Sequence, residues 1–170
     1  MTAEPSLTLI VMGVSGSGKT TVGRRLADRL GCPFVDGDDY HPAENVARMT
    51  AGIPLEDAHR WPWLEALRDV IRRLREKHGT VVAACSALKS SYRDVLRRGD
   101  DSVTFVLLRV DPETVSRRFE QRTDHFMPPE LIESQFETLE EPSDAMIVDA
   151  GKSVEGVVTE ILGMLGRLKG

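Results

Sequence analysis

Apolar and polar residues follow one another along this chain in two different patterns. Short, nearly continuous apolar runs predict buried strands, and they lie at 8–13, 33–36, 80–85, 102–110 and 145–150. Segments with apolar residues three or four positions apart predict amphipathic helices, and they lie at 19–30, 63–77, 89–98, 112–122, 129–140 and 153–168. Strands separated by helices imply parallel βαβ units, so the pattern predicts one doubly wound α/β domain of about five strands.

The 170 residues are expected to form a single domain, 1–170, because no repeat, low-complexity tract or linker divides them. A net charge of −5 at pH 7 argues against a nucleic-acid partner, which would need a basic surface. The two cysteines fit a reducing compartment, and no apolar run reaches the length of a membrane span. Because the first residues also lack the basic segment of a secretory signal, the expected location is the cytoplasm.

The sequence GVSGSGKT at 13–20 matches the phosphate-binding pattern G-x-x-x-x-G-K-[ST], between a predicted strand and a predicted helix. Its glycines allow backbone N–H groups to turn toward phosphate oxygens, and the helix N-terminus favours an anion. Lys19 is expected to reach the β- and γ-phosphates of ATP, and the Thr20 hydroxyl to ligate Mg²⁺. The expected nucleotide-binding residues are Gly13, Val14, Ser15, Gly16, Ser17, Gly18, Lys19, Thr20 and Thr21.

Three carboxylates follow the second predicted strand, at Asp36, Asp38 and Asp39. Like charges this close repel one another, so Mg²⁺ and the Lys19 ammonium are expected to stabilise them. We expect Asp36 to face the metal, directly or through water, and Asp38 to orient and partly deprotonate an alcohol nucleophile. The alternative is an acidic turn that caps the next helix, which is the favoured interpretation for Asp39 alone.

A phosphate-binding loop alone does not define the reaction. The chain has no Asn-Lys-x-Asp motif of a GTPase, and its third predicted strand ends in Cys85 and Ser86 instead of the metal-binding acid of an ATPase motor. A nucleotide-sensing switch would keep 13–20 but would have no need of Asp38, His41 and Arg60 facing the γ-phosphate. Another small-molecule kinase, such as one for shikimate, would share both the loop and the Asp-x-Asp pair.

Five blocks of the sequence bear on this choice: IVMGVSGSGKTTVGRRLADRL, FVDGDDYHPAENVARM, GIPLEDAHRWPWL, CSALKSSYRDVLR and HFMPPELIESQFETLEEP. Over about 8–160 they resemble the gluconokinase family, small P-loop sugar-acid kinases with a nucleoside-monophosphate-kinase-like fold and a small lid. The resemblance implies transfer of the γ-phosphate of ATP to the 6-hydroxyl of D-gluconate, which gives 6-phospho-D-gluconate and ADP. It also implies Mg²⁺ and, commonly, a homodimer.

Two positions depart from the family pattern. His59 stands where an acid is expected before Arg60, and Asp124 stands where a glycine is frequent. Neither residue belongs to the phosphate-binding loop. The first departure raises the expectation that substrate affinity or its pH dependence differs from that of the family.

Gluconate is an anion with a row of hydroxyls, so its site needs a cation for the carboxylate and polar groups along the chain. Within the expected substrate segment, about 37–63, the candidates are Asp38, His41, Arg48 and Arg60. A guanidinium suits a carboxylate because it can bind both oxygens, and Arg60 is favoured over Arg48. Ser86 and Arg93, after the third predicted strand, are expected to face the same crevice, where doubly wound sheets bind ligands.

The stretch 117–130 resembles a lid of the small kinases. Arg118 and Arg122 lie four residues apart on one predicted helix face, and both are expected to act as catalytic cations over the phosphates. A solvated helix face, with Glu120 as a local partner, is the alternative. His125 is a further candidate for substrate contact or for packing under the lid, and the helix with Gln135 would return the lid to the sheet.

Overall fold

The computed structural model describes residues 6–121 and 129–169. Its centre is a sheet of five parallel strands, which follow the order β2-β3-β1-β4-β5. The strands are β1 (Leu7–Met12), β2 (Phe34–Asp36), β3 (Thr80–Ala84), β4 (Val103–Arg109) and β5 (Met146–Asp149). In the register of the sheet, Val11 of the central strand lies beside Ala84 on one side and Val106 on the other. The predicted five-stranded parallel sheet is therefore confirmed.

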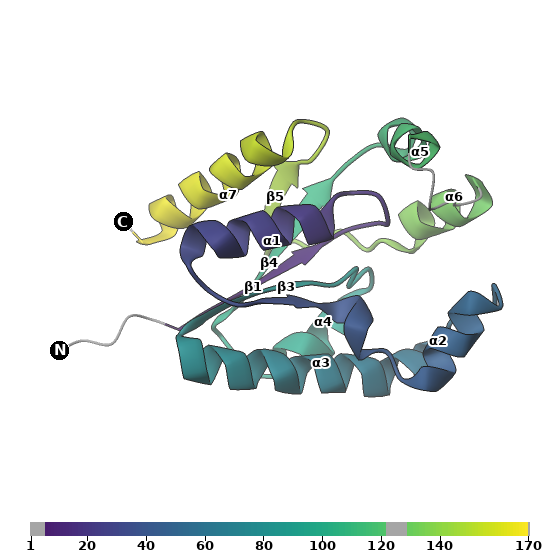
Figure 1. The fold of residues 1–170 in the computed structure, drawn as a ribbon, viewed down its shortest axis with the longest axis horizontal. Helices are drawn as coiled ribbons and strands as arrows, with labels where there is room; N and C mark the ends of the chain where they lie inside the picture. The colour runs from purple at the N-terminus through teal and green to yellow at the C-terminus, as the bar shows by residue number, and fades with distance from the viewer. Residues whose placement is uncertain (1–5, 122–128, 170) are drawn as a thin grey trace.

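Helices cover both faces of the sheet (Figure 1). α1 (Lys19–Leu30) and α7 (Val154–Lys169) pack on one face, and α3 (Asp57–His78) and α4 (Ser90–Arg97) pack on the other. Successive side chains of a strand point to opposite faces, so Leu9 and Val11 face the first helix pair while Ile10 and Met12 face the second. Among the described residues, no helix has the length and apolar composition that a membrane crossing requires.

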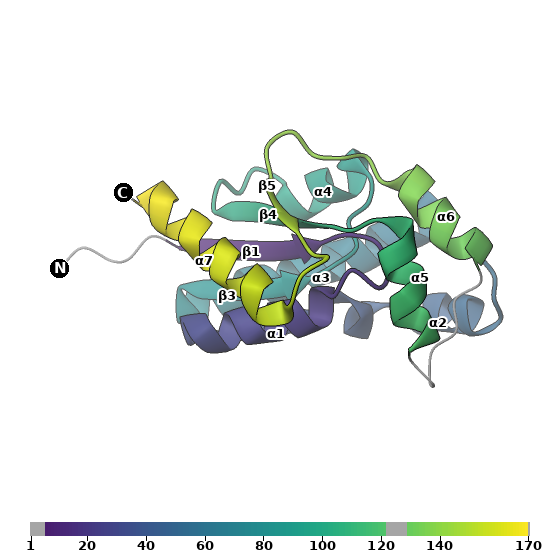
Figure 2. The ribbon, with the colours of Figure 1, turned by 90° about the horizontal axis from the view of Figure 1, so that it is seen from above.

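The segments expected to bind ligands gather at the carboxyl end of the strands. β1 leads through the phosphate-binding loop into α1, and β2 leads into the short 3-10 helix η1 (Gly37–Tyr40) and then α2 (Ala43–Thr50). α5 (Pro112–Glu120) and α6 (Pro129–Thr138) lie at this same end (Figure 2). A doubly wound sheet binds its ligands at this edge.

Two features between β2 and β3 differ from the sequence-based expectation. η1 and α2 were not predicted, because α2 is short and its apolar residues Val46 and Met49 remain exposed. α3 begins at Asp57, before the predicted start at 63, and Pro62 lies inside its first turns. Proline lacks a backbone N–H and usually breaks a helix interior, but the cost is smallest near the amino end.

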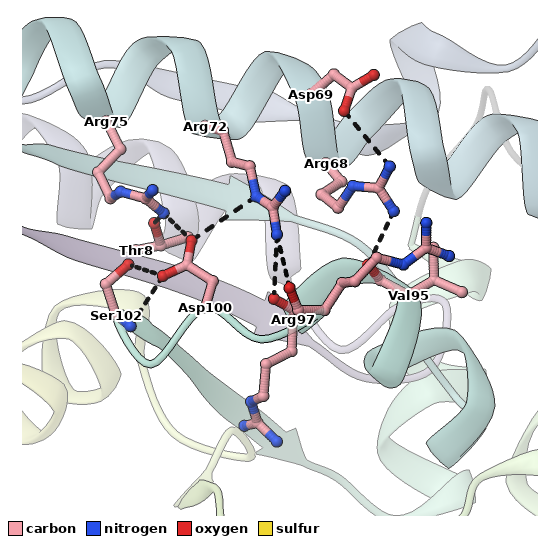
Figure 3. A network of polar contacts seen from close by, with 10 residues as sticks. Thr8, Arg68, Asp69, Arg72, Arg75, Val95, Arg97, Asp100 and Ser102 are labelled. Carbon is pink, nitrogen blue, oxygen red and sulfur yellow. Dashed lines mark hydrogen bonds and ion pairs between the residues drawn. The ribbon is translucent and has the colours of Figure 1, made fainter.

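At the amino end of the strands, opposite the phosphate-binding loop, a polar network joins α3 to the sheet (Figure 3). Asp100, in the turn before β4, accepts hydrogen bonds from the N–H and hydroxyl of Ser102 at 3.0 and 2.7 Å and pairs with Arg75 of α3. Arg75 also contacts Thr8 Oγ1 at 3.4 Å. Arg72 donates to the last carbonyls of α4 and the turn after it. These contacts attach the second half of α3 to β1 and to the turn between α4 and β4.

Candidate active site

The phosphate-binding loop occupies the turn between β1 and α1. Gly18 precedes α1 with φ 99°, a left-handed conformation that glycine adopts without strain. The Gly13 N–H donates to the carbonyl of Ser86 at 3.2 Å, which fixes the start of the loop against the end of β3. The Lys19 ammonium donates to the Val14 carbonyl at 3.1 Å, so it folds back across the loop. The expected nucleotide-binding residues thus form the turn at 13–18 and the first residues of α1, and their role stays a prediction.

Lys19 lies in a crowded, partly desolvated position. Burial lowers the pKa of its ammonium, while the nearby groups Asp38, Cys85 and Asp36 act in the opposite direction. A lysine that is poorly hydrated and near two carboxylates is well placed to exchange them for phosphate oxygens. The structure therefore brings Lys19 and the two predicted acids together.

Asp36 connects β2 to the loop. One carboxylate oxygen accepts a hydrogen bond from Thr20 Oγ1 at 3.2 Å, and the other accepts from the Asp38 N–H at 3.0 Å. Hydroxyl and carboxylate oxygens are ligands that Mg²⁺ prefers, so Thr20 and Asp36 fit the predicted metal position. Gly37 allows this turn, because a Cβ there would lie 2.7 Å from the carbonyl oxygen of Ala84.

Asp38 differs from its neighbour in its surroundings. Burial raises the pKa of its carboxyl, Asp36 and Asp39 raise it further, and Lys19 lowers it. A carboxylate with a raised pKa is a better proton acceptor than an ordinary one. Its position beside Lys19 suits a group that orients a hydroxyl toward a phosphate held by the loop.

The segment after Asp38 is held together by side chains. His41 stacks on Trp63 of α3 with ring centroids 4.0 Å apart, and Trp63 Nε1 donates to the Gly37 carbonyl at 2.7 Å. Asn45 of α2 is only 3% exposed; its Nδ2 lies 3.2 Å from His41 Nδ1 and donates to the His59 carbonyl at 2.9 Å. η1, α2 and the beginning of α3 therefore form one connected unit.

Arg60 lies at the start of α3 over the ring of Tyr92, with 5.3 Å between the guanidinium carbon and the ring centroid. One terminal nitrogen donates to the Leu55 carbonyl at 3.2 Å, while the buried Nε has no hydrogen-bond partner among the described residues. The Tyr92 hydroxyl donates to Asp57 at 2.5 Å, and Asp57 also pairs with Lys89 at 3.2 Å. This arrangement fixes the guanidinium of Arg60 at the start of α3.

The other predicted substrate residues have different positions. Arg48 lies on α2, half-exposed, in the same connected unit as His41. Ser86 lies at the end of β3 directly beside the loop, since its carbonyl accepts from Gly13. The expected role of both residues in substrate binding stays a prediction.

The expected role of Arg93 in substrate binding is not supported. Its side chain is buried, and its guanidinium donates to the carbonyls of Ala87 at 2.7 Å, Leu88 at 3.2 Å and Glu140 at 2.7 Å. Ala87 has φ 46°, an unfavourable conformation for a residue with a side chain. Arg93 therefore holds the strained turn after Ser86 and joins it to the segment after α6.

α5 and α6 both contact the phosphate-binding loop. Arg118 of α5 donates to the Gly16 carbonyl at 2.9 Å and to the Ala150 carbonyl, so it contacts the loop, and its expected role over the phosphates stays a prediction. Gln135 of α6 accepts a hydrogen bond from the Ser15 N–H at 2.6 Å. Arg122 and His125, the other predicted lid residues, and Asp124 lie outside the described residues.

Sequence reasoning assigned no role to several residues that organise the site: Asn45, Asp57, Tyr92 and Lys89. Asn45 had a weak signal, because asparagine is unfavourable inside a helix unless its side chain has a specific partner. Asp57, Lys89 and Tyr92 stand in the family-like blocks, but their mutual contacts join positions more than thirty residues apart. Only the fold brings them together.

Comparisons with known proteins show which family the chain belongs to. Residues 15–165 match the family model described as shikimate kinase. The thermosensitive gluconokinase of Escherichia coli (strain K12) is 46% identical over 155 residues, which cover 89% of this chain and 83% of that protein.

Solved structures extend the comparison to three dimensions. A gluconokinase from Sinorhizobium meliloti 1021 superposes with a TM-score of 0.86 at 43% identity, covering 98% of this chain and 95% of that one. A shikimate kinase from Bacteroides thetaiotaomicron, with a TM-score of 0.65 at 18% identity over 94% of this chain and 98% of that one, shares the fold. The chain therefore has a shikimate-kinase-family domain and belongs to the gluconokinase family.

Proposed function

We propose that this protein transfers the γ-phosphoryl group of ATP to the 6-hydroxyl of D-gluconate, giving 6-phospho-D-gluconate and ADP. The observation that carries the proposal is the position of Asp38 beside Lys19 of the phosphate-binding loop. Asp38 lies in η1, where the Gly37 carbonyl accepts a hydrogen bond from Trp63 of α3, the helix that also carries Arg60. The 46% identity to a named gluconokinase supports gluconate as the acceptor.

In this proposal each charged group has a separate task. The loop N–H groups and Lys19 bind the phosphates and stabilise charge that develops on the transferring group. Asp38 orients the 6-hydroxyl and accepts its proton as the new O–P bond forms. Arg118, which contacts the Gly16 carbonyl of the loop, neutralises charge on the transferring phosphoryl group.

Thr20 and Asp36 would hold the magnesium ion, because their oxygens lie together at the amino end of α1. When bound, Mg²⁺ supplies positive charge that neutralises the phosphates and helps to orient them. The hydrogen bond between Thr20 and Asp36 would be exchanged for contacts to the ion.

We also propose a cytoplasmic homodimer; light scattering of the purified protein at several concentrations tests its oligomeric state.

Arg60 is the first choice for the gluconate carboxylate, and Arg48 is the second. The Arg60 guanidinium packs over the ring of Tyr92 and donates to the Leu55 carbonyl, which would hold it in one orientation for a two-pronged contact to a carboxylate. His41 and Ser86 are the further candidates for contacts to the hydroxyls of gluconate. His125 stays a candidate from the sequence alone.

The proposal is tested by measuring acceptor-dependent ADP release with D-gluconate, sorbitol and shikimate. Sorbitol offers a comparable terminal hydroxyl without the anion, so kcat/KM should fall by about 10- to 100-fold, equivalent to about 1.5–3 kcal/mol for a charge-assisted contact. Shikimate should be a poor acceptor. A preference for shikimate would identify the alternative kinase, and absence of any acceptor dependence would favour a nucleotide-sensing switch.

The carboxylate contact is tested with Arg60→Ala. It should weaken gluconate sharply and leave sorbitol almost unchanged, whereas Arg60→Lys should lie in between because an ammonium lacks the two-pronged geometry. Arg73→Ala, an exposed arginine on the same helix, is the matched control. If Arg60→Ala and Arg48→Ala both keep the full preference, another group holds the carboxylate.

A further inference from the structure

The hydrogen bonds around Asn45 determine the protonation of His41. The carbonyl oxygen of His59 can only accept, so the Asn45 atom 2.9 Å from it must be the amide nitrogen, Nδ2. The same nitrogen lies 3.2 Å from His41 Nδ1. An amide nitrogen donates and does not accept, so His41 Nδ1 must be the acceptor and carries no proton.

We infer that Asn45 is a positioning residue that holds His41 as the neutral tautomer with its proton on Nε2, so that His41 serves as a hydrogen-bond donor to an oxygen of the sugar acid. The inference rests on the proposed function for the identity of that ligand. In this role His41 is neither a general base nor a cation. It donates one neutral hydrogen bond from a fixed direction.

The surroundings of the ring support this assignment. One face of the imidazole is stacked on Trp63 with 18° between the planes, and the Nδ1 edge is occupied by Asn45. Nε2 is therefore the ring's remaining polar atom, and it makes no hydrogen bond to another residue that the structure describes. A ring held on one face and one edge loses little further freedom when a ligand binds.

The charge on His41 is also controlled. Burial lowers the pKa of the imidazole to about 4, and the positive Arg60 on α3 contributes in the same direction. Asn45, which contacts the ring from α2, is uncharged, and Trp63 of α3 is not titratable. His41 therefore stays neutral across physiological pH, unlike a solvent-exposed histidine.

The first test measures the tautomer directly in the wild-type protein. Side-chain ¹⁵N NMR of histidine-labelled protein distinguishes the two neutral tautomers, and the signal of His41 is identified as the one missing in His41→Gln. We expect the Nε2–H form, with no titration between pH 5.5 and 8. A signal of the Nδ1–H form, or a midpoint near 6.5, overturns the inference whether or not gluconate is the substrate.

The second test changes the partner. In Asn45→Asp a carboxylate replaces the donor, so Nδ1 should gain a proton and the pKa of His41 should rise into the range above 5.5. The KM for gluconate should then become dependent on pH where that of the wild type is not. If Asn45→Asp folds and His41 keeps the wild-type tautomer and pKa, Asn45 does not control it.

The third test separates donation from packing. His41→Leu should raise the KM for gluconate by about five- to tenfold, the usual effect of losing one neutral hydrogen bond, with little change in the KM for ATP. His41→Gln places an amide N–H near the position of Nε2 and should restore part of the affinity. His78→Gln, an exposed histidine at the far end of α3, is the matched control. Equal KM values for the Gln and Leu variants contradict a donor role.

Discussion

Asp36 and Asp38 lie two positions apart and differ in what surrounds them. Asp36 uses both carboxylate oxygens, one toward the Thr20 hydroxyl and one toward the backbone of Asp38. Asp38 is desolvated and lies near Lys19, and burial is the largest cause of its raised pKa. Two carboxylates in different environments can take different roles, as proton acceptor and as metal ligand.

Substitution of each acid by asparagine separates these roles. Asp38→Asn should lower kcat by about 100-fold or more with little change in the KM for ATP, because it removes the proton acceptor. Asp36→Asn should instead raise the Mg²⁺ concentration needed for half-maximal rate. Steady-state kinetics over a magnesium series measures both effects, and the reverse pattern would exchange the two assignments.

Lys19 provides a second prediction at this scale. Lys19→Ala should reduce kcat by about 100- to 1,000-fold, the usual loss when one preorganised donor to the transition state is removed. Lys77→Ala, an exposed lysine at the end of α3, controls for the loss of a positive charge. A near-normal kcat in Lys19→Ala, measured with saturating ATP, would disprove the assignment of the phosphate-binding loop.

Among the elements, the start of α3 explains the departure at His59. The imidazole Nδ1 of His59 accepts a hydrogen bond from the Glu56 N–H at 3.0 Å, which is the task that an acidic side chain has in a capping box. The departure from the family pattern therefore keeps the cap and changes the group that forms it. The same turn carries Arg60 and the carbonyl that orients Asn45.

The cap leads to a prediction about stability. His59→Glu should raise the free energy of unfolding by about 0.5 kcal/mol, because a negative charge also interacts favourably with the helix N-terminus. His59→Ala should lower it by about 1 kcal/mol. Urea unfolding measures both, and His78→Glu at the opposite end of the helix should be destabilising. Equal stability of the Glu and Ala variants would show that the cap contributes nothing.

At the scale of the whole molecule, the two ends of the sheet have separate roles. The carboxyl end carries the phosphate-binding loop, and the opposite end carries the network around Asp100 (Figure 3). Burial tends to raise the pKa of Asp100, but hydrogen bonds from Ser102 and Arg75 outweigh it, so the pKa is lowered. A carboxyl with a lowered pKa stabilises the fold above its unfolded-state pKa and loses that effect as the pH falls.

Asp100→Asn should therefore lower the free energy of unfolding by about 2–3 kcal/mol at pH 7, since it leaves Arg75 without its charged partner. The difference from wild type should shrink as the pH falls below about 4, the ordinary pKa of an aspartate. Asp101→Asn, an exposed neighbour, is the control. Urea unfolding at several pH values measures the effect, and a difference that is constant down to pH 3 would contradict it. The folded variant should keep a normal kcat, because the network lies away from the loop.

Much of the architecture could be predicted from the sequence because it depends on local patterns. The apolar runs predicted five parallel strands, and the glycine-lysine-threonine pattern located the loop before α1, both confirmed by the structure. The same patterns failed where apolar residues stay exposed, as on α2, or where a proline lies within a helix, as at Pro62. Packing against the rest of the molecule decides those elements.

The sequence by itself determined which residues could carry phosphate chemistry, because loop spacing and backbone geometry are local properties. Only the tertiary structure decided how their partners act. Arg93 was expected to bind the substrate, but in the fold it is buried and donates to three carbonyls. Asn45 has its role because it contacts His41 and His59. Hydrogen-bond partners and burial set the charge and direction of a side chain, and both depend on residues that are distant in sequence and close only after folding.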